Sequence, residues 1–179
     1  DARGGPQVVS YNVASDNTVP WCESVTVPTW LSIDHEPENN KFPNGAAFVD
    51  FYCSQVDIIR SAGNPLISVG PISMGYAYRS RYGNGLDGSY LPPPDYCDWY
   101  GVDIYQQLPN YNLPDFDYWK NWYGLVQPLH KPILIGEMGI YAEPNQYSGG
   151  TIDPKLQAKR ALLIPQYFDY LNGLGNVIC

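Results

Sequence analysis

The chain has 179 residues, of which 44% are hydrophobic and 16% charged, as is typical of one folded globular domain. Its net charge of −8 argues against nucleic acid and anionic membranes as partners, because both select for basic patches. No stretch approaches the roughly 18 to 20 apolar residues that cross a bilayer. We therefore expect a single domain over residues 1–179 that binds neither nucleic acid nor a membrane.

Short apolar runs predict β-strands along the whole chain. Each run is rich in β-branched or aromatic residues and is bounded by Pro, Gly or Asn. Their near-continuous apolarity indicates strands buried on both faces, as in parallel sheets. The predicted strands are residues 7–13, 29–34, 65–71, 98–105, 132–137 and 176–179.

Helices are predicted between these strands. Residues 46–63 place apolar side chains at helical spacing and end on Gly63, a residue suited to the carboxyl end of a helix. Residues 116–128 form a shorter candidate with an aromatic face. Alternation of strands and helices predicts an α/β fold with right-handed crossovers.

Prolines interrupt two further segments. Residues 153–173 begin as a helix should, but Pro165 would kink or divide that helix. The segment 14–28 contains Pro20 and Pro28 and is too short for a standard crossover helix. We therefore expect no such helix between the first two strands.

The cysteines Cys22, Cys53, Cys97 and Cys179 are widely spaced and form no close pair, which argues against a zinc site. Their even number allows two disulfides, with the pairing left open among three connectivities. The few Lys and many Tyr residues favour an oxidising, extracellular compartment, in which disulfides form. The alternative is buried free thiols in a cytosolic protein. We expect no metal and no other cofactor.

Long loops follow the predicted strands, whereas the returns from helix to strand are short. In a parallel barrel, the loops at the carboxyl ends of the strands build the active site and the opposite loops only close the fold. This asymmetry is what an enzyme barrel would show. The long loops are residues 35–45, 72–96, 106–115 and 138–151.

Two glutamates stand at strand ends. Glu36 follows the strand 29–34, and Glu137 ends the strand 132–137, so both would lie on the same rim of a barrel. Glycoside hydrolysis uses a pair of carboxyl groups, one to protonate the leaving oxygen and one to attack or to activate water. Solvated or salt-bridged acids are the alternative explanation for both residues.

The residues around both glutamates resemble the retaining glycosidases of clan A, which are (β/α)8 barrels. HEPEN after an apolar strand is similar to their acid/base strand, and ILIGEMGIY is similar to their nucleophile strand. A His directly before the acid/base Glu is most similar to glycoside hydrolase family 26, the β-mannanase-type family. The resemblance implies that Glu36 is the acid/base and Glu137 the nucleophile, and the two lie three predicted strands apart, as in that clan.

Five further residues are candidates for substrate binding. The resemblance implies that Tyr105, in VDIY, donates a hydrogen bond to the nucleophile. His35 either orients a carboxylate, contacts a sugar hydroxyl or has only a structural role. Tyr76, Tyr141 and Trp122 lie on or near the rim loops, where aromatic rings either stack on sugars or pack the loops.

The other polar residues near Glu36 have less specific expectations. Asp34 is expected to point away from Glu36 or to anchor a loop, because adjacent strand residues face opposite directions. Glu38 and Asn39 are expected to be solvated, to cap a helix or to touch substrate. HEPEN also lacks the tryptophan-rich continuation of family 26, which leaves the mannan substrate open.

The chain is shorter than the roughly 250 residues of a typical barrel. Counting strands predicts a (β/α)8 barrel truncated at its first strands and last helix, either as a fragment or completed by further polypeptide. The predicted function is hydrolysis of a β-linked polysaccharide outside the cell. One alternative is a carbohydrate-binding or structural module that has lost turnover, and another is an ordinary α/β domain with incidental acids.

Overall fold

A computed structural model of the chain describes residues 7–11, 17–39, 41–78, 87–107, 117–141 and 154–178. These residues alternate between strands and helices and divide into two compact units. Unit 1 comprises Asp1–Met74 with Gly88–Gly101, and unit 2 comprises Gly75–Asp87 with Val102–Cys179. The single domain stays a prediction.

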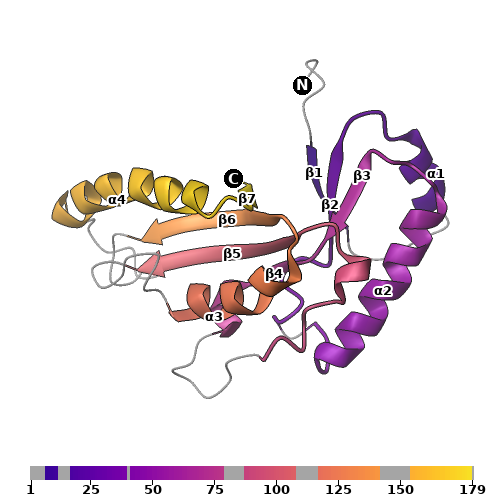
Figure 1. Cartoon of the computed structure of the whole chain (residues 1–179), viewed down its shortest axis with the longest axis horizontal. Coiled ribbons are helices and arrows are strands. Elements are labelled where there is room, and N and C mark those ends of the chain that lie inside the picture. Colours follow the sequence, from indigo (N-terminus) through magenta and orange to yellow (C-terminus); the bar gives the residue numbers. More distant parts are fainter. Residues whose placement is uncertain are drawn as a thin grey trace. The chain divides into compact units, whose positions relative to one another are not determined.

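Three parallel strands form the sheet of unit 1. They are β1 (Gln7–Tyr11), β2 (Thr29–Ile33) and β3 (Ile67–Gly70), paired in the order β1-β2-β3 (Figure 1). Leu31 at the centre of β2 is level with Val9 on one side and Val69 on the other. Leu31 and Val69 are buried, as the apolar runs predict for a covered parallel sheet.

A short helix, α1 (Thr18–Ser24), connects β1 to β2, and with 7 residues it is shorter than a standard crossover helix. Pro20 is the third residue of α1. The amide groups of a first helical turn have no partner within the helix, so proline costs no hydrogen bond there. A proline that would break a longer helix is therefore compatible with this one.

The longest helix of unit 1, α2 (Gly45–Ser61), begins and ends as predicted. The side chain of Asn44 caps its amino end by accepting a hydrogen bond from the amide of Ala47 at 2.9 Å. Gly63 follows its carboxyl end with a φ of 66°, a left-handed conformation that glycine adopts without strain. Its buried stripe consists of Phe48, Tyr52, Val56 and Ile59.

The predicted strand 65–71 is two strands, because Pro71 divides it into β3 and β4 (Ile72–Met74). Proline has no amide hydrogen and cannot continue a ladder, although its carbonyl still accepts a hydrogen bond from the amide of Gly101 at 2.7 Å. The ring of Trp99 lies directly on Gly70, where any side chain would collide with it. Backbone and ring thus approach closely at the end of β3.

A second sheet has the order β4-β5-β6-β7. Strand β5 (Tyr100–Gln107) begins in unit 1 and continues into unit 2, which also holds β6 (Ile133–Tyr141) and β7 (Val177–Ile178). The helices of unit 2 are α3 (Asp117–Val126) and α4 (Pro154–Gly173), which contacts β6 and β7. Helix α4 contains Pro165 and is nonetheless one helix, so Pro165 does not divide it.

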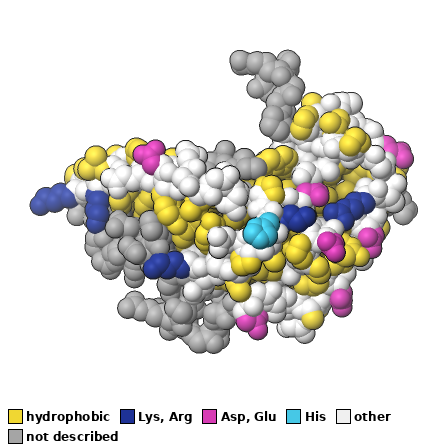
Figure 2. Space-filling view, viewed as in Figure 1, with side chains coloured by type: hydrophobic (Ala, Val, Ile, Leu, Met, Phe, Trp, Pro, Cys, Tyr) yellow, Lys and Arg dark blue, Asp and Glu magenta, His cyan; other side chains and the backbone are white. Residues whose placement is uncertain are grey.

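Helix α4 buries only a narrow stripe of side chains, Leu163, Tyr167 and Leu171. Leu162 is 69% exposed, and Figure 2 shows hydrophobic side chains at the surface along this helix. The acidic side chains visible in Figure 2 lie at separate points and form no single patch. None of the described helices is both long and apolar enough to cross a membrane.

Within each sheet the strands follow one another in chain order, as in a (β/α)8 barrel. The described residues do not form a complete barrel, so the architecture is a partial α/β fold. The strand count that separates the two predicted catalytic glutamates stays a prediction, because β2 and β6 belong to different sheets.

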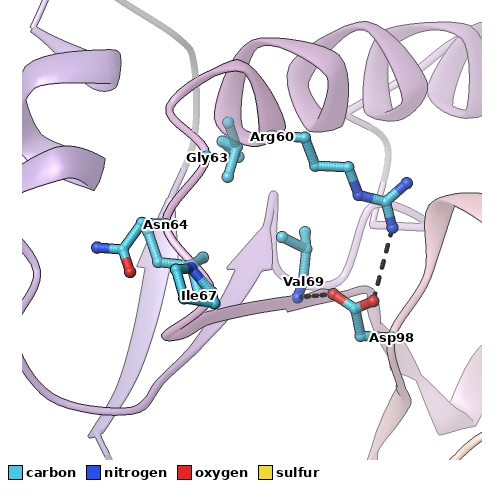
Figure 3. Close-up of a pocket in the computed structure, with 8 residues that line it drawn as sticks. Arg60, Gly63, Asn64, Ile67, Val69 and Asp98 are labelled. Atoms are coloured by element: carbon cyan, nitrogen blue, oxygen red, sulfur yellow. Dashed lines mark hydrogen bonds and ion pairs between the residues drawn. The ribbon is translucent and has the colours of Figure 1, made fainter.

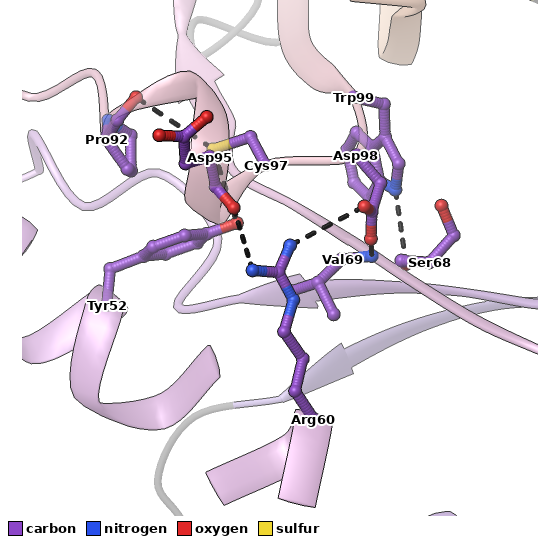
Figure 4. A network of polar contacts seen from close by, with 9 residues as sticks. All are labelled: Tyr52, Arg60, Ser68, Val69, Pro92, Asp95, Cys97, Asp98 and Trp99. Atoms are coloured by element: carbon purple, nitrogen blue, oxygen red, sulfur yellow. Dashed lines mark hydrogen bonds and ion pairs between the residues drawn. The ribbon is translucent and has the colours of Figure 1, made fainter. Parts of the chain in front are cut away.

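The disulfide prediction is not supported, because Cys22, Cys53 and Cys97 are free thiols, and Cys179 lies outside the described residues. Cys97 is completely buried, with its Sγ 3.7 Å from the hydroxyl oxygen of Tyr52 (Figure 4). Burial raises the pKa of the Cys97 thiol to about 11. The thiol is therefore protonated at neutral pH and behaves as a small core residue.

We expect the thiol of Cys97 to resist modification in the folded protein. In a Cys179→Ser variant at pH 8, Ellman's reagent should react first with the partly exposed Cys53, and with Cys97 only after unfolding in urea. Thiol counting with peptide mass spectrometry measures this. Rapid labelling of Cys97 without urea, or a disulfide at this position, would contradict the buried thiol.

Candidate active site

The two predicted catalytic glutamates belong to different units, Glu36 to unit 1 and Glu137 to unit 2. In unit 1, the chain leaves β2 at Ile33 and turns sharply through Asp34 to Asn39. Asp34 and Glu36 have φ values of 53° and 54°, in the left-handed region that non-glycine residues seldom adopt. Such a conformation needs support from the surrounding structure, and it is enriched at functional sites.

Backbone groups of β4 provide part of that support. The amide of Glu36 donates a hydrogen bond to the carbonyl of Ile72 at 2.9 Å. The amide of Met74 donates to the carboxylate Oε2 of Glu38 at 3.0 Å. These two hydrogen bonds fix the turn against β4 at both ends.

Glu38 therefore has a definite structural role, where a solvated, capping or substrate-contacting role was expected. Lys41 is a second support that the sequence did not indicate. Its ammonium group pairs with Asp34 at 2.9 Å and also donates to the carbonyl oxygen of His35. Through this ion pair Asp34 anchors the loop, which is one of the two roles expected for it.

The side chains of His35 and Glu36 are half-buried at this turn, between the buried end of β2 and the exposed Asn39. Pro37 is buried and follows Glu36 directly. Glu36 is thus presented at the carboxyl end of a parallel strand by a backbone that is held on both sides. This is the position in which barrel enzymes place catalytic groups.

In unit 2, the hydroxyl group of Tyr105 donates a hydrogen bond to Oε2 of Glu137. The two residues lie on β5 and β6, which are neighbours in the sheet. Glu137 is exposed and Tyr105 is 38% exposed, whereas Asp103, two residues before Tyr105, is buried. The contact expected between these two residues is therefore present, while their catalytic roles stay predictions.

The three aromatic candidates have different surroundings. Tyr76 is 54% exposed on the 3-10 turn Gly75–Tyr78, so its ring is accessible. Trp122 is completely buried beside Trp119 in α3 and offers no face to a ligand, so the stacking expectation for it is wrong in this structure. The side chain of Tyr141 lies outside the described residues.

A pocket in unit 1 lies at the other end of the strands, where β3 begins (Figure 3). Asp98 closes one side of it by accepting a hydrogen bond from the amide of Val69 at 2.7 Å and pairing with Arg60 at 3.6 Å. Arg60 also donates to the carbonyl of Asp95 (Figure 4). In barrels this face contributes to stability and not to catalysis. The lining residues are Ile59, Arg60, Gly63, Asn64, Pro65, Ile67, Val69 and Asp98.

Comparison with known proteins yields a structural resemblance only. No protein-family model matches the chain, and no curated protein matches it in sequence. The structure is similar to a GH26 β-mannanase from Bacteroides ovatus, with a TM-score of 0.53 and 14% identity, over 78% of this chain and 44% of that one. It also matches a GH128 (subgroup II) endo-β-1,3-glucanase from Sorangium cellulosum, with a TM-score of 0.47 and 12% identity, over 77% of this chain and 58% of that one.

The match to the mannanase shows a shared fold over the matched part of the chain and nothing beyond the fold. The chain spans less than two thirds of the length of both similar structures.

The left-handed backbone at Glu36 makes a prediction about stability that is independent of activity. Glu36→Gly should be more stable than Glu36→Ala by about 1 kcal/mol in free energy of unfolding, because glycine adopts positive φ without a Cβ clash. Urea denaturation of both variants measures the difference.

The same pair of substitutions at Glu23, an exposed residue of α1, is the matched control. There alanine should be the more stable replacement, because glycine is the poorer helix former. Equal stability of the two variants at position 36 would show that the turn is not held in a left-handed conformation.

Proposed function

We propose that this chain carries the catalytic carboxyl groups of a retaining glycoside hydrolase that cleaves a β-linked polysaccharide. The observation that carries the proposal is the hydrogen bond from Tyr105 to Glu137. It fixes one carboxylate oxygen of an exposed glutamate, and a carboxylate held in one orientation is suited to attack a bound sugar. The fold shared with a GH26 β-mannanase supports the same function.

The reaction would proceed by double displacement. Glu137 attacks the anomeric carbon while Glu36 donates a proton to the leaving oxygen, which gives a glycosyl-enzyme and a shortened sugar chain. Water then attacks the same carbon, Glu36 removes its proton, and the ester to Glu137 breaks. The strained turn at Glu36 supports this assignment, because a fixed backbone presents the acid at a constant position.

The substrate class is proposed as β-linked polysaccharide, with β-mannan as the first candidate because the similar structure is a β-mannanase. The exposed ring of Tyr76 would then provide an apolar face for a sugar. His35, next to the proposed acid, would contact a sugar hydroxyl or orient a carboxylate.

A non-catalytic carbohydrate-binding module is the second candidate. The observation that favours it is the exposed ring of Tyr76, which offers an apolar face to a sugar whether or not the two glutamates act on that sugar. In this case the chain would bind the polysaccharide without cleaving it.

Charge-removing substitutions distinguish the two candidates. Glu137→Gln should abolish hydrolysis with binding retained, and Glu36→Gln should lower kcat by roughly 100- to 10,000-fold, because it removes general acid–base catalysis. Glu23→Gln, an equivalent change at an exposed helical residue, should leave activity unchanged. Reducing-sugar release from β-mannan and other β-glycans measures hydrolysis, and affinity electrophoresis measures binding.

Wild-type protein that binds one of these polysaccharides but releases no sugar would support the module. Wild-type protein that neither binds nor cleaves any β-glycan would contradict both candidates. Hydrolysis that survives Glu137→Gln would assign the nucleophile to another residue.

The retaining mechanism also requires a particular carboxyl separation. In a crystal structure with a bound oligosaccharide, the carboxyl groups of Glu36 and Glu137 should lie about 5–5.5 Å apart. A separation near 9 Å would leave room for an attacking water and would indicate inversion instead. Proton NMR of the first-formed anomer provides an independent check of the stereochemistry.

A further inference from the structure

Gly139 lies on β6 two residues after Glu137, so both positions face the same side of the strand. A Cβ atom at Gly139 would lie 2.6 Å from Cδ1 and 2.8 Å from Cε1 of Tyr105. Carbon atoms in contact are ordinarily about 3.5–4.0 Å apart. The ring of Tyr105 therefore occupies the space that any other residue at position 139 would need.

Backbone conformation does not explain this glycine. Gly63, Gly88 and Gly175 have positive φ values, and Gly139 is not among them. Its place in the extended strand β6 is one that every amino acid can adopt. What position 139 supplies is the absence of a side chain.

Two contacts with β6 thus fix the position of the Tyr105 ring. Its edge rests on Gly139, and its hydroxyl group reaches Glu137 on the same face. A tyrosine side chain is rigid beyond its two rotatable bonds, so displacement of the ring also displaces the hydroxyl oxygen. The contact at Gly139 and the hydrogen bond at Glu137 are therefore geometrically linked.

We propose that Gly139 is a positioning residue for the proposed nucleophile. It acts by letting the edge of the Tyr105 ring lie close enough to β6 for the hydroxyl group to hold Glu137. The catalytic consequence rests on the proposed function, whereas the packing relation does not. Gly139 itself need not touch a substrate.

A methyl group at position 139 has a specific expected effect. To restore ordinary contact, the ring of Tyr105 must move outward by about 1 Å. Tyr105 is 38% exposed, so the ring has room to move without unfolding the strand. The hydroxyl then leaves Glu137, and the carboxylate loses the donor that fixes it.

Kinetics of Gly139→Ala should show a lower kcat with little change in KM. The expected loss is roughly 10- to 100-fold, the usual effect of removing a hydrogen bond to a charged group. Tyr105→Phe should lose a similar amount, since it removes the same hydroxyl. In a Tyr105→Ala background there is no ring to displace, so Gly139→Ala should cause no further loss.

Gly124→Ala is the matched control. Gly124 lies on α3 with open space around the position of its missing Cβ atom, so the same substitution meets no neighbour. It should leave kcat and KM unchanged. Thermal denaturation followed by circular dichroism shows whether either alanine variant has lost its fold.

A readout without substrate separates this inference from the proposed function. In protein labelled with 13C at tyrosine Cζ, the signal that is missing from Tyr105→Phe belongs to Tyr105. That signal should shift in Gly139→Ala, because the hydroxyl changes its hydrogen bonding, and should stay in place in Gly124→Ala. A shift in a protein that hydrolyses no glycan would support the positioning role while the proposed function fails.

Two results would overturn the inference. One is an unchanged Tyr105 signal in Gly139→Ala. The other is an equal loss of kcat from Gly139→Ala in the wild-type and Tyr105→Ala backgrounds, which would show that Gly139 acts through something other than the ring.

Discussion

Parallel pairing of β1, β2 and β3 is the constraint on which the turn over residues 34–39 depends. This turn, which contains Asp34, Glu36 and Glu38, is called the acidic turn below. Parallel strands bring their carboxyl ends to one edge of a sheet, so whatever follows β2 emerges beside whatever follows β3. Pro71 interrupts the ladder of hydrogen bonds at this edge, and a new strand, β4, begins directly after it. The carbonyl of Ile72 and the amide of Met74 then bind the turn that contains Glu36. Main-chain groups of β4 and the side chains of Glu38 and Lys41 together hold the turn that presents the half-buried Glu36.

Much of the fold follows from patterns that act locally. The stripe of apolar residues in α2 and the glycine after it determine that helix, because each acts through its immediate neighbours. The alternation of elements predicted the chain order of the strands in each sheet. The contact between Tyr105 and Glu137 was expected from a resemblance to glycosidase motifs, and no rule of composition or spacing would have supplied it.

Other features depend on contacts between distant parts of the chain. Trp122 resembles a surface platform when only its neighbours in sequence are considered, yet tertiary packing buries it completely. Glu38 bonds an amide that is 36 residues away, and no local pattern indicates that partner. An even number of cysteines predicted disulfides, but Cys97 lies in the core as a thiol. The oxidising, extracellular compartment stays a prediction.

The two main-chain groups of β4 that bind the acidic turn also decide which substitutions this part of the sequence tolerates. The carbonyl of Ile72 and the amide of Met74 would be offered by almost any residues at those positions, so these two hydrogen bonds do not depend on which side chains stand there. Of the partners in these two bonds, only Glu38 contributes a side chain. Substitutions at positions 72 and 74 therefore act on the turn through packing and not through the loss of these hydrogen bonds.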